Sequence, residues 1–257
     1  MNPKNILIAN WPAPENIHAF TTLRNGMGVS KPPFDQFNLG NRNSEQGDDP
    51  VAVEKNRELL EQAFSLPDSP HWLRQVHGVD VLRFDDAPKQ SGDYHQDEPV
   101  ADASVTSKKN IVLSILTADC LPALFCNSDG SEVAAAHAGW RGLANGVLEN
   151  TVRAMHSKPE DIMVWLGPTA GPAAYEIGAE VRDAFVQNNR HAEVAFVPSR
   201  ENHWKVDLHQ LARMRLQSTG ISRVYGSDHC TITKEDRFFS HRRDQNTGRM
   251  ASLIWMS

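Results

Sequence analysis

The sequence predicts an α/β (α+β) fold in which a mixed β-sheet core packs against helices. Short apolar segments, several of them β-branched, have the character of buried strands, and they alternate irregularly with amphipathic segments typical of helices. This mixed order favours a sandwich over a purely doubly wound sheet. The 257 residues contain no internal repeat and no linker of altered composition, so we expect one domain over residues 1–257.

The first predicted helix begins after Asp49, where Pro50 suits the first helical position. Val53, Leu60 and Phe64 form its apolar stripe. The polar, acid-rich segment 84–99 is predicted to be a surface excursion between strands. The later elements predicted are strands at 111–116 and 132–137, a helix within 143–157, a strand at 162–167, a helix at 179–189, a strand at 193–198, a helix from 207 to 220, and strands at 238–243 and 250–256.

Composition excludes several classes of protein. With 32 acidic and 26 basic residues, the formal charge of −6 gives no global attraction to nucleic acid or to anionic membranes. No apolar run is long enough to span a membrane, and the first residues lack the pattern of a secretory leader, so we expect a cytoplasmic protein. The three cysteines, Cys120, Cys126 and Cys230, are too few for a secreted disulfide framework, which leaves reduced thiols available.

Three potential metal ligands lie near the ends of predicted strands. His77 precedes a glycine turn in RQVHG, Cys120 follows strand 111–116 in TADCLP, and His137 ends the next strand in AAAHAGWRG. Their spacings of 43 and 17 residues are unlike the short pairs of structural zinc sites, so the residue types alone favour a buried cysteine and two hydrogen-bonded histidines. If the fold brings the three together, they would form a site with an open fourth position, as in catalytic zinc enzymes.

The chain resembles the YfiH family, also called the laccase-domain or peptidoglycan-editing-factor family, which includes FAMIN-like purine nucleoside phosphorylases. The resemblance spans nearly the whole chain and is carried, in order, by TTLRNGMGVS, NLG, GDDP, KNR, QVHG, TADCLP, HAGWRG, FFSHRRD and TGR. It implies a YfiH-like sandwich, of the type also found in cytotoxic necrotizing factor. It further implies zinc bound by His77, Cys120 and His137, all of which are present.

The resemblance also implies an activity. Members of the family cleave adenosine, inosine and S-methyl-5′-thioadenosine with phosphate, deaminate adenosine and, in bacteria, take part in editing peptidoglycan precursors. We therefore expect a purine nucleoside and phosphate as ligands, with Cys120 and His137 in catalytic positions. Phosphate is expected at the helix start that follows His137, where backbone N–H groups around Gly142 face outward and Arg141 can add charge. An exposed arginine in a first helical turn is the alternative for Arg141.

Arg57 is a further candidate for catalysis and for phosphate or substrate binding. It shares the apolar stripe of the first helix, and the resemblance places KNR near the active site. The alternative is a buried stem with its charged end in water. Of Arg242 and Arg243, at most one is expected to face the site, since neighbours on a strand point to opposite sides. For Asp119 we favour a structural hydrogen bond over a role as a base.

Other functions remain to be weighed. A multicopper polyphenol oxidase, the older label of the family, needs paired HxH ligands that this chain lacks, although adventitious copper could give weak oxidation. The main alternative is a metal-free cysteine hydrolase, in which Cys120 pairs with His137 or His77 and attacks an amide or ester such as a muropeptide bond. A non-enzymatic nucleoside-binding module is the third class. The sequence does not distinguish a monomer from a dimer.

Overall fold

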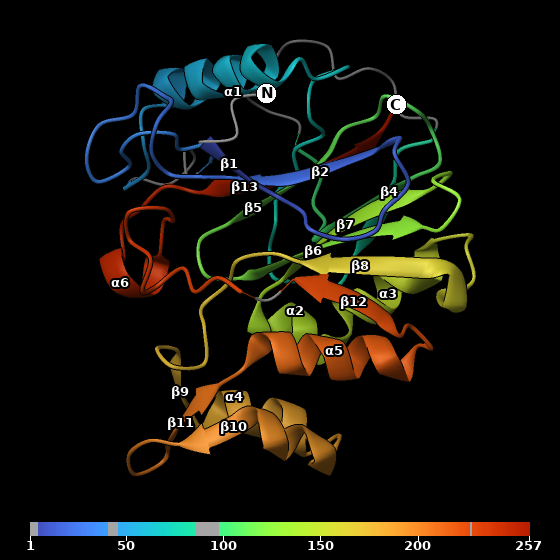
Figure 1. Ribbon diagram of the computed structural model, residues 1–257. Coiled ribbons are helices and arrows are strands. Elements are labelled where there is room, and N and C mark those ends of the chain that lie inside the picture. Colours follow the sequence, from blue (N-terminus) through green and yellow to red (C-terminus); the bar gives the residue numbers. More distant parts are fainter. Residues whose placement is uncertain (1–4, 41–45, 86–97, 227) are drawn as a thin grey trace.

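The computed structural model describes residues 5–40, 46–85, 98–226 and 228–257, and it confirms the mixed α/β architecture. Two sheets stack face to face, with helices on both outer sides (Figure 1). In spatial order, one sheet contains β1 (Ile6–Ile8), β2 (Ile17–Thr22), β13 (Met250–Met256) and β5 (Leu113–Thr117). The other contains β12 (Arg223–Gly226), β8 (Ile162–Leu166), β6 (Leu121–Asn127), β7 (Val133–Ala138), β4 (Ala103–Thr106) and β3 (Val81–Arg83).

Helices cover the outer faces, and a small third sheet lies beyond them (Figure 1). Beside the four-stranded sheet lies α1 (Pro50–Phe64), and beside the six-stranded sheet lie α2 (Trp140–Asn145), α3 (Val147–Ala154) and α5 (Leu208–Ser218). The remaining elements are β9 (Glu176–Gly178), α4 (Ala179–Val186), β10 (Phe196–Pro198), β11 (His203–Val206), α6 (His241–Asp244) and the short 3₁₀ segments Pro159–Asp161 and Arg190–Ala195. The third sheet has the order β10-β11-β9.

The helix boundaries follow the predicted capping chemistry. The Asp49 side chain accepts a hydrogen bond from the Val51 N–H at 2.9 Å, so α1 begins where predicted. The Asp207 side chain does the same for the Gln210 N–H at 2.9 Å, which starts α5. Just beyond the end of α5, Gly220 adopts a φ of 96°, a conformation that favours glycine.

Some predicted elements differ from the structure. The helix expected within 143–157 is two helices, because Gly146 has a φ of 99° and interrupts it. Only the last three residues of 193–198 form a strand, since a 3₁₀ segment precedes them. The strand predicted at 238–243 is wrong: the Ser240 side chain accepts from the Arg243 N–H and caps the short helix α6. Most of the predicted excursion at 84–99 lies outside the described residues.

The central layer of the molecule is the six-stranded sheet, which is buried on both faces. In β6, Phe125 packs into the core shared with the helices, whereas Leu124 and Cys126 pack toward the four-stranded sheet. A fully buried side chain such as Phe125 contributes about 1.5–3 kcal/mol to the free energy of unfolding. Burial raises the pKa of the Cys126 thiol to about 12, so this cysteine is a core residue with little reactivity.

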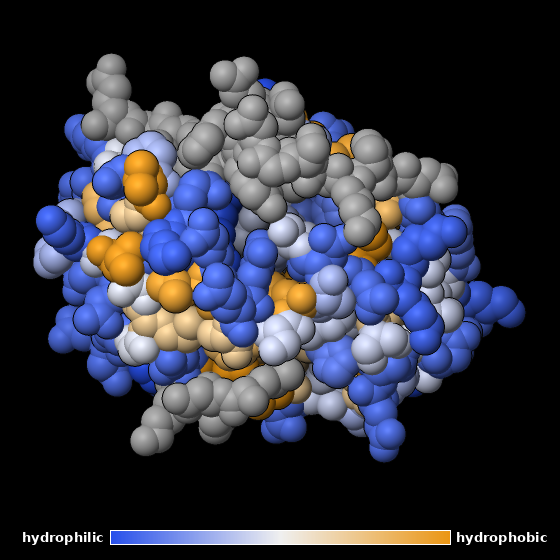
Figure 2. All heavy atoms as spheres, turned by 90° about the horizontal axis from the view of Figure 1, so that it is seen from above, coloured by the Kyte–Doolittle hydropathy of each residue, from blue (hydrophilic) through white to orange (hydrophobic). Residues whose placement is uncertain are grey.

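The outer surface is mainly polar. On the face seen from the α1 side, hydrophilic residues predominate and hydrophobic ones gather in small groups (Figure 2). Within the described ranges, no helix combines the length and the apolar character needed to cross a membrane.

Candidate functional site

The three predicted ligands come from connections that meet at one end of the six-stranded sheet. Strands β6 and β7 are antiparallel, with Pro122 opposite His137, so Cys120 before β6 lies beside the end of β7. Strand β4 pairs with β7, and β3 runs parallel to β4, so the segments preceding both strands reach the same end. His77 lies in the segment before β3. The sheet topology therefore joins residues that the sequence separates by 43 and 17 positions.

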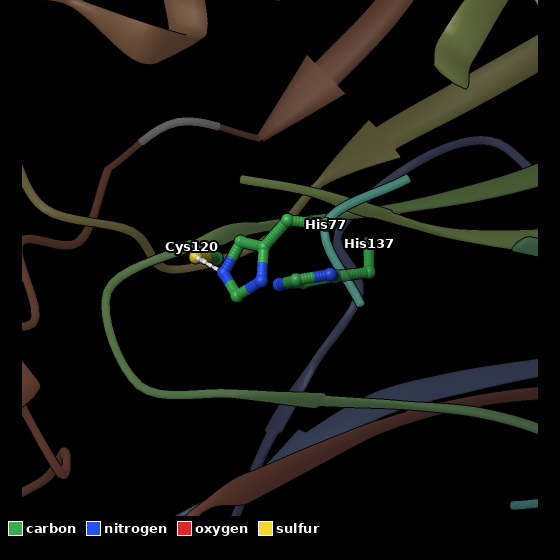
Figure 3. Close-up of side chains that lie close together, drawn as sticks. All are labelled: His77, Cys120 and His137. Carbon is green, nitrogen blue, oxygen red and sulfur yellow. Dashed lines mark hydrogen bonds between the residues drawn. The ribbon is translucent and has the colours of Figure 1, made fainter. Parts of the chain in front are cut away.

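The side chains of His77, Cys120 and His137 point toward one another (Figure 3). Their potential ligand atoms all lie within 4.8 Å of each other, and His77 Nε2 is 3.6 Å from Cys120 Sγ. Zinc binds sulfur at about 2.3 Å and imidazole nitrogen at about 2.0–2.1 Å, so neighbouring ligand atoms of a tetrahedral site lie about 3.3–3.8 Å apart. The donor set could hold a metal ion, and the 3.6 Å separation of His77 Nε2 and Cys120 Sγ lies in the range of a zinc site. Among the described residues this is the one such cluster of His, Cys, Asp and Glu side chains.

Because Gly139 has no side chain, the side chains of His77 and Cys120 can pack directly against its backbone. A Cβ atom at this position would lie 2.6 Å from His77 Cδ2 and 3.0 Å from Cys120 Sγ. Both distances are shorter than ordinary van der Waals contact. The glycine in HAGWRG is therefore a steric requirement of the site.

Asp102, which sequence reasoning missed, organises the histidines. Its carboxylate is completely buried and accepts hydrogen bonds from the backbone N–H groups of Val76, His77 and Gly78 at 3.1, 2.9 and 2.7 Å. It also accepts from His137 Nδ1 at 2.8 Å. This last bond leaves Nε2 of His137 as the ring nitrogen available to a metal. One carboxylate thus fixes both the His77 segment and the His137 ring.

The electrostatics of the pair formed by Cys120 and His137 favour a charged thiolate. Burial alone would raise the pKa of the Cys120 thiol, but His137 and His77 outweigh burial and lower this pKa to about 6. Burial alone would lower the pKa of His137, whereas the Cys120 thiolate and Asp102 raise it to about 9. A thiolate is both a zinc ligand and a nucleophile, so this arrangement suits either chemistry.

The backbone around His77 is closely packed against the start of α2. His77 itself has a φ of 61°, which is uncommon for a residue with a side chain. A Cβ at Gly142 would lie 2.8 Å from the carbonyl oxygen of Gly78. Gly142, predicted to bind phosphate, therefore permits a close approach between α2 and the His77 segment, and its role toward phosphate stays a prediction.

A cavity of about 570 Å³ opens beside this group. Arginines lie on its wall, and two aromatic rings, those of Trp140 and Tyr175, provide flat surfaces. The guanidinium of Arg141 lies 4.3 Å from the Trp140 ring centroid, and that of Arg242 lies 4.8 Å from the Tyr175 centroid. The remaining arginines that line the cavity are Arg74 and Arg249.

Arg57 does not line this cavity. Its buried guanidinium stacks 4.0 Å from the Trp72 ring centroid, donates from Nε to the Leu39 carbonyl at 3.1 Å, and pairs through Nη1 with Glu98 at 3.0 Å. The predicted inward orientation is confirmed, while direct binding of phosphate stays a prediction. Glu98, which sequence reasoning did not single out, does line the cavity.

Asp119 has the structural hydrogen-bonding role that the sequence favoured. Its carboxylate accepts from Thr231 Oγ1 at 2.5 Å, from Ser240 Oγ at 3.0 Å and from the backbone N–H of Arg242 at 2.6 Å. These bonds hold α6 against the turn before β6. Arg242 reaches the cavity, whereas the guanidinium of Arg243 donates to backbone carbonyls away from it. The two arginines diverge on a helix, not on the strand expected.

The chain is similar to known proteins over its whole length. A family model described as "Multi-copper polyphenol oxidoreductase laccase" matches residues 18–257. A Xylella fastidiosa protein named "Purine nucleoside phosphorylase" is 53% identical over 256 residues, covering 99% of this chain and 98% of the relative. "Purine nucleoside phosphorylase YfiH" of Escherichia coli is 47% identical over 251 residues and covers 98% of both chains. A crystal structure from Neisseria meningitidis superposes with a TM-score of 0.89 at 44% identity, covering 99% of this chain and 100% of its own.

Proposed function

The chain belongs to the family described as multi-copper polyphenol oxidoreductase laccase, and we propose that it is a zinc-dependent purine nucleoside phosphorylase. The names of its relatives support this proposal. The observation that carries it is the convergence of His77, Cys120 and His137 beside an arginine-lined cavity. The chain has no two histidines in an HxH pair, which argues against a multicopper centre despite the name of the family.

In the proposed reaction a phosphate oxygen attacks C1′ of the nucleoside. The bond from C1′ to the purine nitrogen breaks, and its electron pair leaves with the purine. Arg141 and Arg242 would bind the phosphate dianion through charge-assisted hydrogen bonds, and the rings of Trp140 and Tyr175 would flank the flat base. The cavity volume is within the range of small-molecule sites. A bound zinc ion would supply a Lewis acid with an open coordination position.

Metal content and adenosine turnover test the proposal together. We expect one zinc per chain and release of adenine only when phosphate is present. Chelation and Cys120→Ala should each abolish the release, whereas Cys230→Ser, at a half-buried cysteine that does not line the cavity, should retain it. Metal-free protein that does not turn over nucleosides would refute the proposal.

The low pKa of Cys120 favours a second candidate, a metal-free cysteine hydrolase. The thiolate would attack the carbonyl carbon of an amide or ester, and His137 would give its proton to the leaving group. Water would then release the acyl group from sulfur. The hydrogen bond that His137 Nδ1 donates to Asp102 would orient the imidazole in this chemistry. Alkylation of Cys120 would abolish such an activity, and a chelator would leave it unchanged.

Two further activities are part of the proposal because the family resemblance implies them. Adenosine deamination would replace the 6-amino group by water-derived oxygen, so inosine and ammonia would form without phosphate. Editing of peptidoglycan precursors would appear as cleavage of muropeptides by the same protein. We place these activities in the cytoplasm, where reducing conditions keep the Cys120 thiol available.

A further inference from the structure

In the described part of the chain, three histidines line the cavity, and His241 is the one that does not belong to the candidate metal site. It is the first residue of α6 and is exposed to water. Ser240 caps this helix, and the Asp119 carboxylate accepts from the backbone N–H of Arg242 at 2.6 Å. Asp119 directly precedes Cys120, so these bonds hold α6, and His241 with it, beside the candidate site.

The ring of His241 is oriented by a backbone carbonyl. Its Nδ1 donates to the carbonyl oxygen of Gln245 at 2.6 Å, and the N–H of Gln245 donates back to the His241 carbonyl at 2.8 Å. Gln245 itself has a φ of 58°, which is uncommon for a residue with a side chain, and backbone of this kind persists only where surrounding contacts hold it. Because Nδ1 is engaged, Nε2 is the ring nitrogen available to a ligand.

The bond to Gln245 suits the release of a proton from Nε2. An imidazolium carries a proton on both ring nitrogens. When Nε2 gives up its proton, the neutral ring keeps the proton on Nδ1 and the same bond to the carbonyl, so the ring does not have to turn. Water can then return the proton to the exposed side chain between turnovers. Histidine is also the side-chain type that ordinarily changes charge between about pH 5 and 8.

The other groups on the described wall are less suited to supply a proton. The Asp119 carboxylate accepts from three donors and the Glu98 carboxylate accepts from Arg57, so both act as acceptors. Burial and the negative charge of the nearby Cys120 thiolate raise the pKa of the Tyr175 hydroxyl to about 12, so this hydroxyl holds its proton. The arginines keep their protons at all accessible pH values. The histidine on α6 is therefore the best proton donor outside the potential metal ligands.

His241 also lies near the place proposed for the purine. Its neighbour Arg242 stacks its guanidinium 4.8 Å from the centroid of the Tyr175 ring, one of the two rings proposed to flank the base. When the bond to C1′ breaks, the electron pair leaves with the purine, and the base departs as an anion unless a ring nitrogen takes up a proton. Purine N7 is an acceptor on the edge of the base and can receive it.

We propose that His241 is the general acid of the reaction, and that it transfers its Nε2 proton to N7 of the purine as the bond from C1′ to N9 breaks. This inference rests on the proposed phosphorylase function and deepens it. The electron pair of the broken bond stays on the purine, the proton leaves Nε2, and the neutral imidazole takes a proton from water after the base has left.

The test compares kcat/KM for inosine and 7-methylinosine in the presence of phosphate. The methyl group gives the purine a positive charge, so this base leaves without needing a proton. His241→Asn keeps an amide donor near the position of Nδ1 but has nothing at Nε2. It should lower kcat/KM for inosine by about 100- to 10,000-fold, the usual contribution of a general acid, and should change the value for 7-methylinosine little. His241→Gln, which has no proton to transfer, should show the same selective loss.

His203→Asn is the matched control. His203 also donates from Nδ1 to a backbone carbonyl, that of Glu201 at 2.8 Å, but it does not line the cavity. This variant should retain kcat/KM for both nucleosides. Activity of His241→Asn on 7-methylinosine shows in the same assay that the variant is folded.

Three outcomes would overturn the inference. Equal losses for both nucleosides in His241 variants with an unchanged circular dichroism spectrum would indicate binding or packing instead of proton transfer. An unchanged kcat/KM for inosine would remove His241 from the chemistry, and in both cases the turnover by unsubstituted protein would leave the phosphorylase function intact. If the unsubstituted protein cleaves neither nucleoside with phosphate, the phosphorylase function itself fails, and the inference fails with it.

Discussion

Replacing Asp102 by asparagine should weaken metal binding and folding together. The substitution preserves the size of the side chain but exchanges one acceptor oxygen for an NH₂ donor. In the structure both oxygens accept, one from His77 N and His137 Nδ1 and the other from Val76 N and Gly78 N. Either orientation of the amide therefore sets its NH₂ group against backbone N–H donors. Where that group faces His137, it also drives the ring proton to Nε2, the nitrogen that a metal requires.

The magnitude follows from the number of bonds that are lost. Each hydrogen bond to a charged group contributes about 1.5–3 kcal/mol, and asparagine can keep roughly half of the four. Because neighbouring bonds are not additive, we expect the free energy of unfolding to fall by about 2–4 kcal/mol. For a chain of this size that corresponds to a Tm lower by about 4–16 °C. Zinc affinity should fall by about 10- to 100-fold, as for other partners of metal-bound histidines.

Thermal unfolding of metal-free protein, followed by circular dichroism, measures the first effect. Competition with a chromophoric chelator at a temperature where the variant is folded measures the second. Asp80→Asn is the control, since Asp80 is an exposed aspartate close to the same connection, and its Tm should change little. A Tm within about 1 °C of the unsubstituted protein, together with unchanged zinc affinity, would refute the assignment of Asp102 as the organising carboxylate.

Three other perturbations have defined outcomes. Gly139→Ala should lower zinc affinity, measured by the same chelator competition, because its Cβ would lie 2.6 Å from the His77 ring; unchanged affinity would contradict the steric role of this glycine. In metal-free protein the rate of alkylation at Cys120, followed by mass spectrometry, should rise with pH through an inflection near pH 6 and then reach a plateau. Added zinc should protect the thiol. An inflection near pH 9 would contradict a Cys120 thiolate at neutral pH. Burial alone would raise the pKa of the Glu132 carboxyl, but hydrogen bonds from the backbone N–H of His156 and from Arg83 outweigh burial and hold this pKa below 4.5 in the folded state. The stabilisation from Glu132 is therefore complete above that pH and is lost as the pH falls through the folded-state pKa. Glu132→Gln should therefore flatten the acid limb of a plot of Tm against pH, and an unaltered slope would contradict this linkage.

The sequence identified the three potential ligands by residue type, whereas their assignment to one shared site came from the family resemblance and not from their spacing. Two histidines and a cysteine are recognisable ligand types wherever they occur, whereas the close approach at Gly139 is evident only in the structure. The positions of the helix starts were predictable because Asp49 and Asp207 cap the N–H groups of residues close in sequence. Ser240 also caps locally, but the aromatic and β-like residues beside it favoured a strand.

The remaining features depend on register, which no local pattern contains. Asp102 lies in an unremarkable segment, and its role arises because β4 pairs with β7 so that the residue before Ala103 lies beside His137. The same holds for Arg57 and Glu98, which are 41 positions apart and meet only in the folded chain. Periodicity predicted that Arg57 points inward, but it contains no information about the partner that it meets there.

Two buried carboxylates, those of Asp102 and Asp119, each join two of the segments that form the site. Asp102 binds the His77 segment to His137, and Asp119 binds the turn at Cys120 to the C-terminal segment that provides Arg242. Ligands on connections between strands would otherwise move independently, because each connection is fixed only where its strand begins. Anchoring the connections in pairs reduces the conformational entropy lost when a metal or substrate binds. Spacings that look arbitrary in the sequence are therefore compatible with a preorganised site, provided that such carboxylates link the connections.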